Sequence, residues 1–336
     1  MNNLVKFSAA CALAIGSLGA AQADTLGDVQ AKGYLNCGVS TGLVGFSSAD
    51  SNGTWKGLDV DVCRAVAAAT LGDASKVKYV PLTAKERFTA LQSGEIDMLS
   101  RNTTWTATRD TSLGLNFAGV NYYDGQGFMV RKSLGVNNAK DLDGATFCIQ
   151  AGTTTELNLA DYFRSNGMKF NTLAVDTSAQ SRNGFESGRC DALTSDQSQL
   201  YALRTTLKDP SSAMVLEDVI SKEPLGPVVR QGDDKWFNIV KWSLNAMITA
   251  EELGVSSENI HSGFKNPEVN RLLGKAGTLN EPLGLDKKWA ANIVSQVGNY
   301  GQSFERNIGH STPLNISRGL NALWSQGGIL YSPPFR

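Results

Sequence analysis

Short apolar runs alternate with longer amphipathic or alanine-rich stretches in the first part of the chain. The apolar runs of strand length are residues 34–39, 77–80 and 96–100. Between them, residues 59–71 (DVDVCRAVAAATL) are alanine-rich and end at Gly72, and residues 84–93 also follow a helical pattern. This order of strand, helix, strand, helix and strand predicts an α/β unit with a mainly parallel sheet flanked by helices.

The same order returns further along the chain and predicts a second α/β unit. Its expected strands are residues 145–150, 171–175 and 191–195, and its expected helices are residues 154–165, 179–187 and 197–206. Two connecting segments, 121–131 and 220–231, lie at the ends of this unit and contain glycine or proline. If the chain enters the second unit through one segment and returns through the other, the first unit is discontinuous. We therefore predict two lobes with two hinge crossings. Residues 24–126 and 232–336, with a C-terminal helical extension, form lobe 1, and residues 127–231 form lobe 2.

The N-terminus has the pattern of a secretory signal peptide. Lys6 precedes an apolar run over residues 7–21, which ends in the small-residue site Ala21-Gln22-Ala23. Cleavage after Ala23 predicts an exported, periplasmic protein that begins at Asp24. An uncleaved membrane anchor is the alternative, but the run is shorter than the roughly 20 apolar residues that a membrane-spanning helix needs.

The charge balance argues against several classes of partner. The chain has 31 basic and 32 acidic residues and a formal net charge of −1. It therefore has no long-range attraction for nucleic acid or for an anionic membrane. The length of 336 residues exceeds what a single core usually supports, which agrees with two lobes. We expect a monomer that needs no cofactor.

Four cysteines remain after residue 23, an even number that suggests disulfides in an exported protein. They are Cys37, Cys63, Cys148 and Cys190. Four cysteines allow three connectivities, and we favour Cys37–Cys63 and Cys148–Cys190 because each pair then falls within one predicted lobe. The cysteines have no CxxC spacing, and the two histidines lie far from them in sequence, so we expect no metal site.

Polar residues follow the predicted strands at the points where ligands bind in parallel α/β sheets. These positions are Ser40-Thr41, Arg101-Asn102-Thr103-Thr104, Gly152-Thr153-Thr154-Thr155 and Asp196. Helix capping is the alternative explanation for serine, threonine and aspartate at such places. Capping does not account for the charged residues beside them, which are Arg109 and Asp196. Arg101 is a further candidate ligand-binding residue.

Arg109 and Asp196 carry the charges that a free amino acid would require. An arginine binds a carboxylate through two parallel N–H···O bonds, a geometry that lysine does not reproduce. An aspartate at the end of a strand accepts hydrogen bonds from an ammonium group. Together they would bind the two charged groups of an α-amino acid, provided that the fold brings them into one cleft.

Several segments resemble the bacterial solute-binding proteins of the polar amino-acid ABC transporter family. GLDVDVC at residues 57–63 resembles the family signature. Three later segments resemble its ligand-binding segments, and these are RNTTWTATRD at 101–110, GTTTE at 152–156 and CDALTSDQS at 190–198. The matches keep a consistent order from about residue 34 to residue 231, and RGLNALW at 318–324 is similar to the general L-amino-acid-binding branch.

The resemblance implies the type II periplasmic-binding-protein fold and a role for individual residues. Arg109 matches the arginine that binds the ligand α-carboxylate, and Asp196 matches the aspartate that binds the α-amino group. Asn102, Thr104 and Thr154 match residues that assist the carboxylate. The resemblance also implies an inner-membrane ABC permease as partner, to which the protein delivers a free L-amino acid.

Departures from the family pattern bear on specificity. Relatives specific for basic side chains have an acidic residue after the first strand and aromatic residues at two further positions. Here these positions are Ser40, Leu43 and Ala84. Without a carboxylate or stacking rings, a preference for lysine or arginine has no physical basis. We therefore expect Ser40 and Leu43 to face the ligand side chain in a pocket of broad specificity.

Two enzymatic functions are the alternatives to a binding protein. Gly38 to Gly42 matches G-x-S-x-G and makes a hydrolase using Ser40 conceivable, but that motif requires a helix directly after the turn, and a loop pattern follows here. A dehydratase-like enzyme on the same scaffold would need an additional acid or base, and the strand ends supply none apart from Glu156, which we interpret as a residue early in a helix. Asp59 and Asp61 could suggest a metal site or a carboxylate dyad, but acidic residues at the start of a helix are explained by capping and the helix dipole. We therefore expect a binding protein and not an enzyme.

Overall fold

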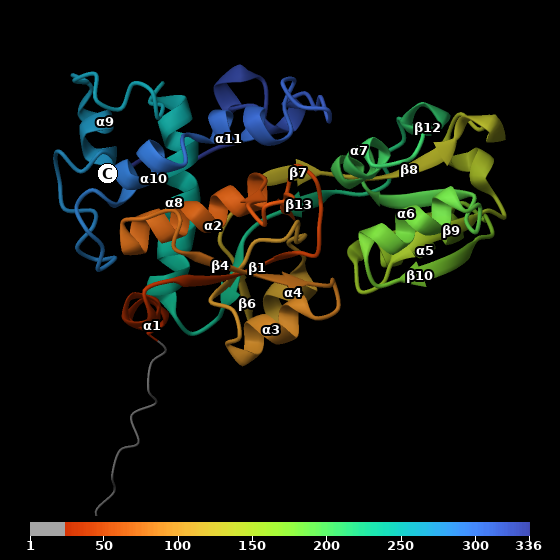
Figure 1. The fold of residues 1–336 in the computed structure, drawn as a ribbon, viewed down its shortest axis with the longest axis horizontal. Coiled ribbons are helices and arrows are strands. Elements are labelled where there is room, and N and C mark those ends of the chain that lie inside the picture. The colour runs from red at the N-terminus through yellow and green to blue at the C-terminus, as the bar shows by residue number, and fades with distance from the viewer. Residues whose placement is uncertain (1–23) are drawn as a thin grey trace, which may run out of the picture.

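The computed structural model describes residues 24–336 and contains two five-stranded sheets, one in each of two lobes (Figure 1). The strands of the first sheet, in spatial order, are β4 (Val77–Leu82), β1 (Leu35–Ser40), β5 (Met98–Leu99), β14 (Val228–Arg230) and β6 (Leu115–Phe117). Those of the second sheet are β10 (Asn171–Val175), β9 (Thr146–Gln150), β11 (Ala192–Asp196), β8 (Gln126–Arg131) and β12 (Ala213–Val215). A short hairpin of β2 (Ser48–Ala49) and β3 (Trp55–Lys56) precedes the second helix.

Both sheets combine three parallel strands with two antiparallel pairings. In the first, β1 is parallel to β4 and β5, and β14 is antiparallel to β5 and β6. In the second, β9 is parallel to β10 and β11, and β8 is antiparallel to β11 and β12. The parallel strands are those that the alternation of strands and helices predicts. The antiparallel strands β8 and β14 come from the two connecting segments.

The two lobes are joined by a pair of crossing strands, β7 (Tyr122–Asp124) and β13 (Glu223–Leu225), which lie side by side between them (Figure 1). They pair antiparallel, with Glu223 opposite Asp124. The predicted boundary of the second lobe at residue 231 is wrong by a few residues. Val228 and Val229 of β14 are buried in the first sheet, so the chain has returned to the first lobe before residue 228.

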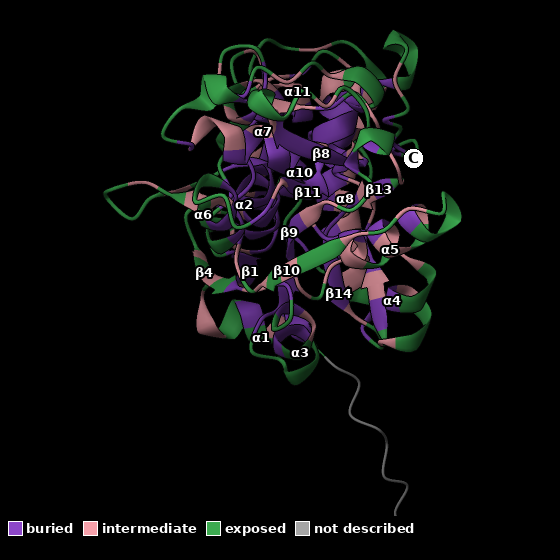
Figure 2. Ribbon diagram, turned by 90° about the vertical axis from the view of Figure 1, so that its right-hand side faces the viewer, coloured by how far each residue is buried: buried purple, intermediate pink, exposed green. Residues whose placement is uncertain are grey.

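Helices cover both sheets, and further helices joined by loops lie in the C-terminal part of the chain. Those of the first lobe and its extension are α1 (Thr25–Lys32), α2 (Leu58–Leu71), α3 (Arg87–Ser93), α4 (Ala107–Ser112), α8 (Asp234–Glu252), α9 (Pro267–Leu272), α10 (Trp289–Gln296) and α11 (Tyr300–Asn307). Those of the second lobe are α5 (Thr154–Ser165), α6 (Ser178–Glu186) and α7 (Gln197–Thr205). The short 3₁₀ helices are η1 (Lys132–Leu134), η2 (Ala139–Leu142), η3 (Pro210–Ser212), η4 (Gly319–Asn321) and η5 (Trp324–Gln326). The inner strands of both sheets and the inner helix faces are buried, whereas the edge strand β10 and the outer faces of the helices are largely exposed (Figure 2).

Helix α2 is the central helix of the first lobe and packs against α8 and α10. Its small alanine side chains let these neighbours approach closely, and it ends at Gly72, whose φ of 71° suits a residue without a side chain. Gly57 is the N-cap, and neither aspartate makes a side-chain capping bond among the residues that the structure describes, so the capping part of the interpretation is wrong. Both aspartates do lie in the first turn of the helix, as the helix-dipole part expected. Asp59 instead accepts from the Asn102 backbone N–H at 2.7 Å, and Asp61 from the Arg306 guanidinium at 2.6 Å.

Both favoured disulfides are confirmed. Cys37 on β1 is bonded to Cys63 on α2, and Cys148 on β9 is bonded to Cys190, which precedes β11. The Cα atoms are 6.1 Å and 5.5 Å apart, within the usual range for a disulfide. Each bond therefore staples a strand to a neighbouring segment of the same lobe.

The predicted signal peptide, residues 1–23, lies outside the residues that the structure describes. Among residues 24–336, no helix has both the length and the apolar character needed to cross a membrane.

Candidate functional site

Residues from both lobes line a small cavity, which we call the cleft cavity. Its lining residues are Arg87, Arg101, Asn102, Thr104, Gln150, Thr153, Thr154, Thr155, Ser195, Asp196 and Gln199. Most of them follow the carboxyl ends of β5, β9 and β11, where the sequence predicted a site. The structure thus brings together five candidates, which are Arg101, Asn102, Thr104, Thr154 and Asp196.

The cleft cavity is nearly closed by direct contacts between the lobes. The hydroxyl oxygens of Thr104 and Thr154 are 3.3 Å apart, and the Asn102 side-chain amide donates to the Gln199 carbonyl at 3.2 Å. The remaining volume is about 20 Å³, enough for about one water molecule. Entry of a larger ligand therefore requires the lobes to separate.

Asn102 shapes the turn after β5. Its φ of 30° lies in the left-handed region, which asparagine tolerates better than most residues. This conformation directs its backbone N–H to the Asp59 carboxylate in α2, where it donates at 2.7 Å. The same carboxylate accepts from the Asn121 side chain at 3.0 Å. Asp59 therefore anchors both the strand-end turn and the approach to β7.

Asp196 is a buried carboxylate with 5% of its surface exposed, and it ends β11. It occupies the N-cap position of α7, but within residues 24–336 its side chain makes no capping hydrogen bond. Burial raises the pKa of Asp196 well above its ordinary value, and the nearby Asp124 and Glu223 carboxylates raise it further, against the opposing effect of Arg87 and Arg109. Its negative charge is therefore only partly compensated by the protein.

Asp124 on β7 provides the cap that Asp196 does not. The Ser198 backbone N–H, at the second position of α7, donates to the Asp124 carboxylate at 3.3 Å, and the Ser198 hydroxyl donates to the same oxygen. Burial raises the pKa of Asp124 to about 6. A crossing strand thus caps a helix of the second lobe.

Three buried arginines lie around the cleft. Arg109 donates from Nη1 to the Thr104 carbonyl at 2.8 Å, and its guanidinium carbon lies 5.0 Å from the centre of the Phe88 ring. Arg101 donates from Nε to the Leu82 carbonyl at 3.0 Å. Burial lowers the pKa of Arg109, while Glu223 and Asp196 oppose the shift, so their charges act on this guanidinium. Arg109 itself is not part of the cavity lining, although it adjoins Thr104, which is.

Arg87 is a cleft residue that the sequence interpretation missed. Only 2% of its surface is exposed, its two hydrogen bonds to Thr103 and Gly152 are long at 3.4 and 3.5 Å, and its Nε has no partner among the described residues. Burial lowers the pKa of Arg87 well below its ordinary value, with the Arg101 and Arg109 charges adding to the effect. It follows the end of β4, so reading that strand end as well would have found it.

Ser40 and Leu43 do not reach the cleft cavity. Both are buried, and Leu43 belongs to the hydrophobic core of the first lobe. The chain after β1 turns back on itself, with Leu43 bridged to Ser47, and the next helix begins only at Leu58. The strand, turn and helix that a nucleophile elbow requires are therefore not formed around Ser40.

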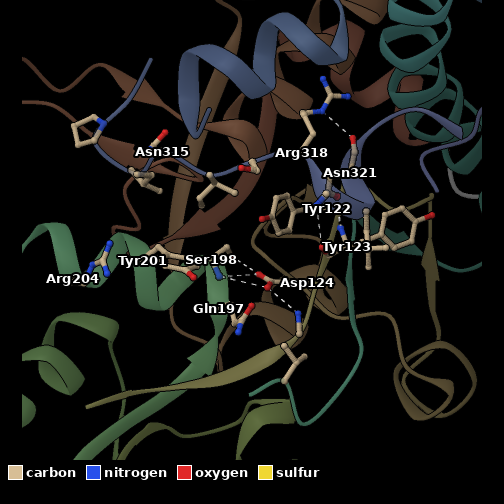
Figure 3. Close-up of a pocket in the computed structure, with 18 residues that line it drawn as sticks. Tyr122, Tyr123, Asp124, Gln197, Ser198, Tyr201, Arg204, Asn315, Arg318 and Asn321 are labelled. Atoms are coloured by element: carbon tan, nitrogen blue, oxygen red, sulfur yellow. Dashed lines mark hydrogen bonds between the residues drawn. The ribbon is translucent and has the colours of Figure 1, made fainter. Parts of the chain in front are cut away.

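A second, larger cavity of about 600 Å³, the C-terminal cavity, lies beside β7 and α7 (Figure 3). It is lined by Tyr122–Gly125, by α7 residues including Ser198 and Tyr201, and by residues 313–321. The Asp124–Ser198 contact lies in its wall, as does Arg318, which donates to the Asn321 carbonyl at 3.0 Å (Figure 3). Asp196 and Gln199 line the cleft cavity instead, so the start of α7 separates the two cavities.

Two α/β lobes, two crossing strands and buried charges of both signs between the lobes define a two-lobe solute-binding protein. The chain belongs to family 3 of the bacterial extracellular solute-binding proteins, whose family model matches residues 35–259. It is 60% identical to the putative amino-acid ABC transporter-binding protein YhdW of Escherichia coli O157:H7 over 93% of this chain and 92% of that protein. It is 57% identical to the general L-amino acid-binding periplasmic protein AapJ of Rhizobium johnstonii over 97% of both chains.

A solved structure agrees with this assignment along almost the whole chain. The ABC transporter periplasmic binding protein from Brucella ovis, with glutathione bound, superposes with a TM-score of 0.91 at 55% identity. The match covers 94% of this chain and 100% of that one. The likeness therefore includes most of the C-terminal part beyond residue 259, where the family model ends.

Proposed function

We propose that this protein binds free L-amino acids between its two lobes and delivers them to an inner-membrane ABC permease for import. The observation that carries the proposal is the Asp196 carboxylate, which is buried in the cleft without capping its helix while arginines lie around the same cleft. Such an arrangement suits a ligand that brings charges of both signs. The names of the relatives YhdW and AapJ support the same function.

The ligand would complete the charge pairs of the cleft. Asp196 from the second lobe binds the α-ammonium, and Arg109 from the first lobe binds the α-carboxylate, with Arg101 and Asn102 beside it. An unpaired buried charge costs several kcal/mol, so closure on the ligand is favourable only when both charges meet partners. Because the partners lie on different lobes, the ligand itself stabilises the closed state.

Ligand choice would depend on the groups that remain. We assign Arg87 to the ligand side chain, since its Nε lacks a partner in the part of the chain that the structure describes and it lines the cleft cavity. Side chains that carry a carboxylate or carboxamide would then bind best within a broad range. The relative AapJ, a general L-amino acid-binding protein, supports breadth.

Further features follow from the same proposal. The protein is exported to the periplasm with residues 1–23 removed and works as a monomer. One lobe consists of residues from 24 to about 121 and from about 228 onward, and the other of the residues between the crossing strands. Amino acids leave the cleft chemically unchanged, so the protein is a carrier and not an enzyme.

A thermal-shift screen of residues 24–336 against the common L-amino acids tests the function. Many of them should raise the melting temperature of the protein, because a ligand that binds only the folded state stabilises it. Asp196→Asn should abolish these shifts while the protein remains folded. A wild-type protein that no amino acid stabilises would refute the proposal, and recovery of a modified ligand would refute the carrier role.

A further inference from the structure

Glu223 is a buried carboxylate on the crossing strand β13, with 1% of its surface exposed. Its oxygen Oε2 accepts from the Thr104 hydroxyl at 2.6 Å and from the Thr154 hydroxyl at 2.8 Å. Its other oxygen, Oε1, accepts from the Asn158 side chain at 2.6 Å and from the Ser221 hydroxyl at 2.7 Å. One carboxylate thus contacts the first lobe, the second lobe and the segment just before its own strand.

These four contacts indicate an ionised carboxylate. A carboxylate has about four acceptor positions and no proton to donate. Hydrogen bonds of hydroxyl groups to a charged oxygen are shorter and stronger than neutral ones, in keeping with the distances seen here. The protons of the Thr104 and Thr154 hydroxyls therefore point at Glu223.

This orientation fixes what the two hydroxyls offer to a ligand. A hydroxyl has one proton and two lone pairs, so a hydroxyl that donates to Glu223 presents only lone pairs elsewhere. Both threonines line the cleft cavity together with Asp196. The two hydroxyls and the Asp196 carboxylate therefore offer three acceptor groups on the cavity wall, and an ammonium group has three donors to place on them.

We propose that Glu223 is a positioning residue that orients the Thr104 and Thr154 hydroxyls, one from each lobe, as acceptors for the α-ammonium of the ligand. The inference rests on the proposed function and changes one part of it, because the resemblance assigned both threonines to the carboxylate. Glu223 itself does not line the cavity and acts through the hydroxyls.

A purely structural role is the competing explanation. Glu223 pairs with Asp124 across the two crossing strands, so its hydrogen bonds could simply hold the hinge. The two roles differ in which oxygen matters. A structural role depends on the Asn158 and Ser221 contacts of Oε1 as much as on those of Oε2, whereas the positioning role depends on the threonines alone.

The test compares Glu223→Gln and Thr104→Val with Asn158→Ala and Ser221→Ala. Binding of L-glutamine, L-glutamate and L-leucine is measured by calorimetry, and melting without ligand shows that each variant folds. Glu223→Gln and Thr104→Val should each weaken binding roughly tenfold, by the same factor for every ligand that the wild type binds, since all share the ammonium. Asn158→Ala and Ser221→Ala should stay within about threefold. The exposed Glu217→Gln, with the same chemical change, serves as the matched control.

The outcomes separate the possibilities. If Glu223→Gln binds as the wild type does, or if Asn158→Ala weakens binding as much, Glu223 is not a positioning residue. If Glu223→Gln does not fold, unchanged binding by Thr104→Val still overturns the proposal. A wild-type protein that binds none of the three ligands refutes the proposed function instead.

Discussion

Asp124 caps helix α7 through Ser198, although Asp196 occupies the N-cap position of that helix. Aspartate at an N-cap ordinarily accepts from the free N–H groups of the first turn. Because the crossing strand supplies this acceptor, the Asp196 carboxylate remains directed at the cleft cavity. The capping contact lies in the wall of the C-terminal cavity, so neither the Asp124 carboxylate nor the Ser198 hydroxyl has to touch a ligand.

Asp124→Ala should weaken amino-acid binding several-fold although Asp124 is outside the cleft lining. The uncapped helix would draw Asp196 into the capping role, and loss of a cap costs about 1 kcal/mol of folding stability. Calorimetry and melting curves measure the two effects. Ser198→Ala keeps the backbone N–H contact and should have the smaller effect. Wild-type affinity in Asp124→Ala would show that the cap does not hold Asp196 in place.

Arg109→Ala should reduce affinity for every amino acid by a similar factor. Truncating one member of a buried charge pair costs about 2–5 kcal/mol, much of it from the charge left behind. Titration with several ligands measures the loss. Arg164→Ala, which removes an exposed arginine, is the matched control. Retained affinity would mean that another arginine binds the α-carboxylate.

Arg87→Gln should instead discriminate between ligands. Amino acids with a carboxylate or carboxamide side chain should lose roughly tenfold in affinity, because a charged donor is lost, whereas aliphatic ones should change little. Competition among L-glutamate, L-glutamine and L-leucine measures the ratio. A uniform loss across the three would place Arg87 with the groups that bind the ligand backbone.

The affinity for amino acids should fall as the pH falls. Burial raises the pKa of Asp196, and an ammonium beside it lowers that pKa again because it stabilises the ionised form. Binding therefore releases a proton below the raised pKa of the free protein, and affinity is lost as the pH drops through it. Calorimetry in buffers of different ionisation enthalpy, between about pH 5 and 8, detects this release. Affinity that is constant or rises toward acid would contradict the assignment.

Removing either disulfide should destabilise the protein without changing the ligand contacts. The bonds close loops with sequence separations of 26 and 42 residues. Loop-closure entropy then gives about 3–4 kcal/mol for each bond. Urea unfolding of Cys37→Ala/Cys63→Ala and of Cys148→Ala/Cys190→Ala measures the loss. A folded variant with strongly altered affinity would show that the bond also shapes the cleft.

The sequence alone predicted those cleft residues whose positions follow from the order of strands and helices along the chain. Asn102, Thr104, Thr154 and Asp196 were found because the carboxyl ends of parallel strands meet at one edge of a sheet. The disulfide pairing followed from the assignment of cysteines to lobes. These inferences need only the order of strands and helices along the chain.

Other residues depend on contacts between distant segments. Glu223 and Asp124 become neighbours through the pairing of β7 with β13, which no local pattern specifies. Ser40 and Leu43 are not among the residues that line the cleft cavity, because the loop after β1 folds back through the Leu43–Ser47 bridge, which no local pattern specifies. The capping of α7 likewise comes from another part of the chain, so the local capping rule did not apply to Asp196.

Because β7 pairs with β13, the lobes are connected by one two-stranded ribbon instead of by two independent linkers. On one side, the Asn321 side chain bonds both the N–H and the carbonyl of Tyr123, and the Tyr300 hydroxyl donates to the Asn121 carbonyl at 2.7 Å. The ribbon is thus fastened at its first-lobe end by residues close to the C-terminus. The paired strands therefore form a single hinge axis about which the two lobes can rotate. A partner that recognises the shut form would then meet the same outline whichever solute is enclosed.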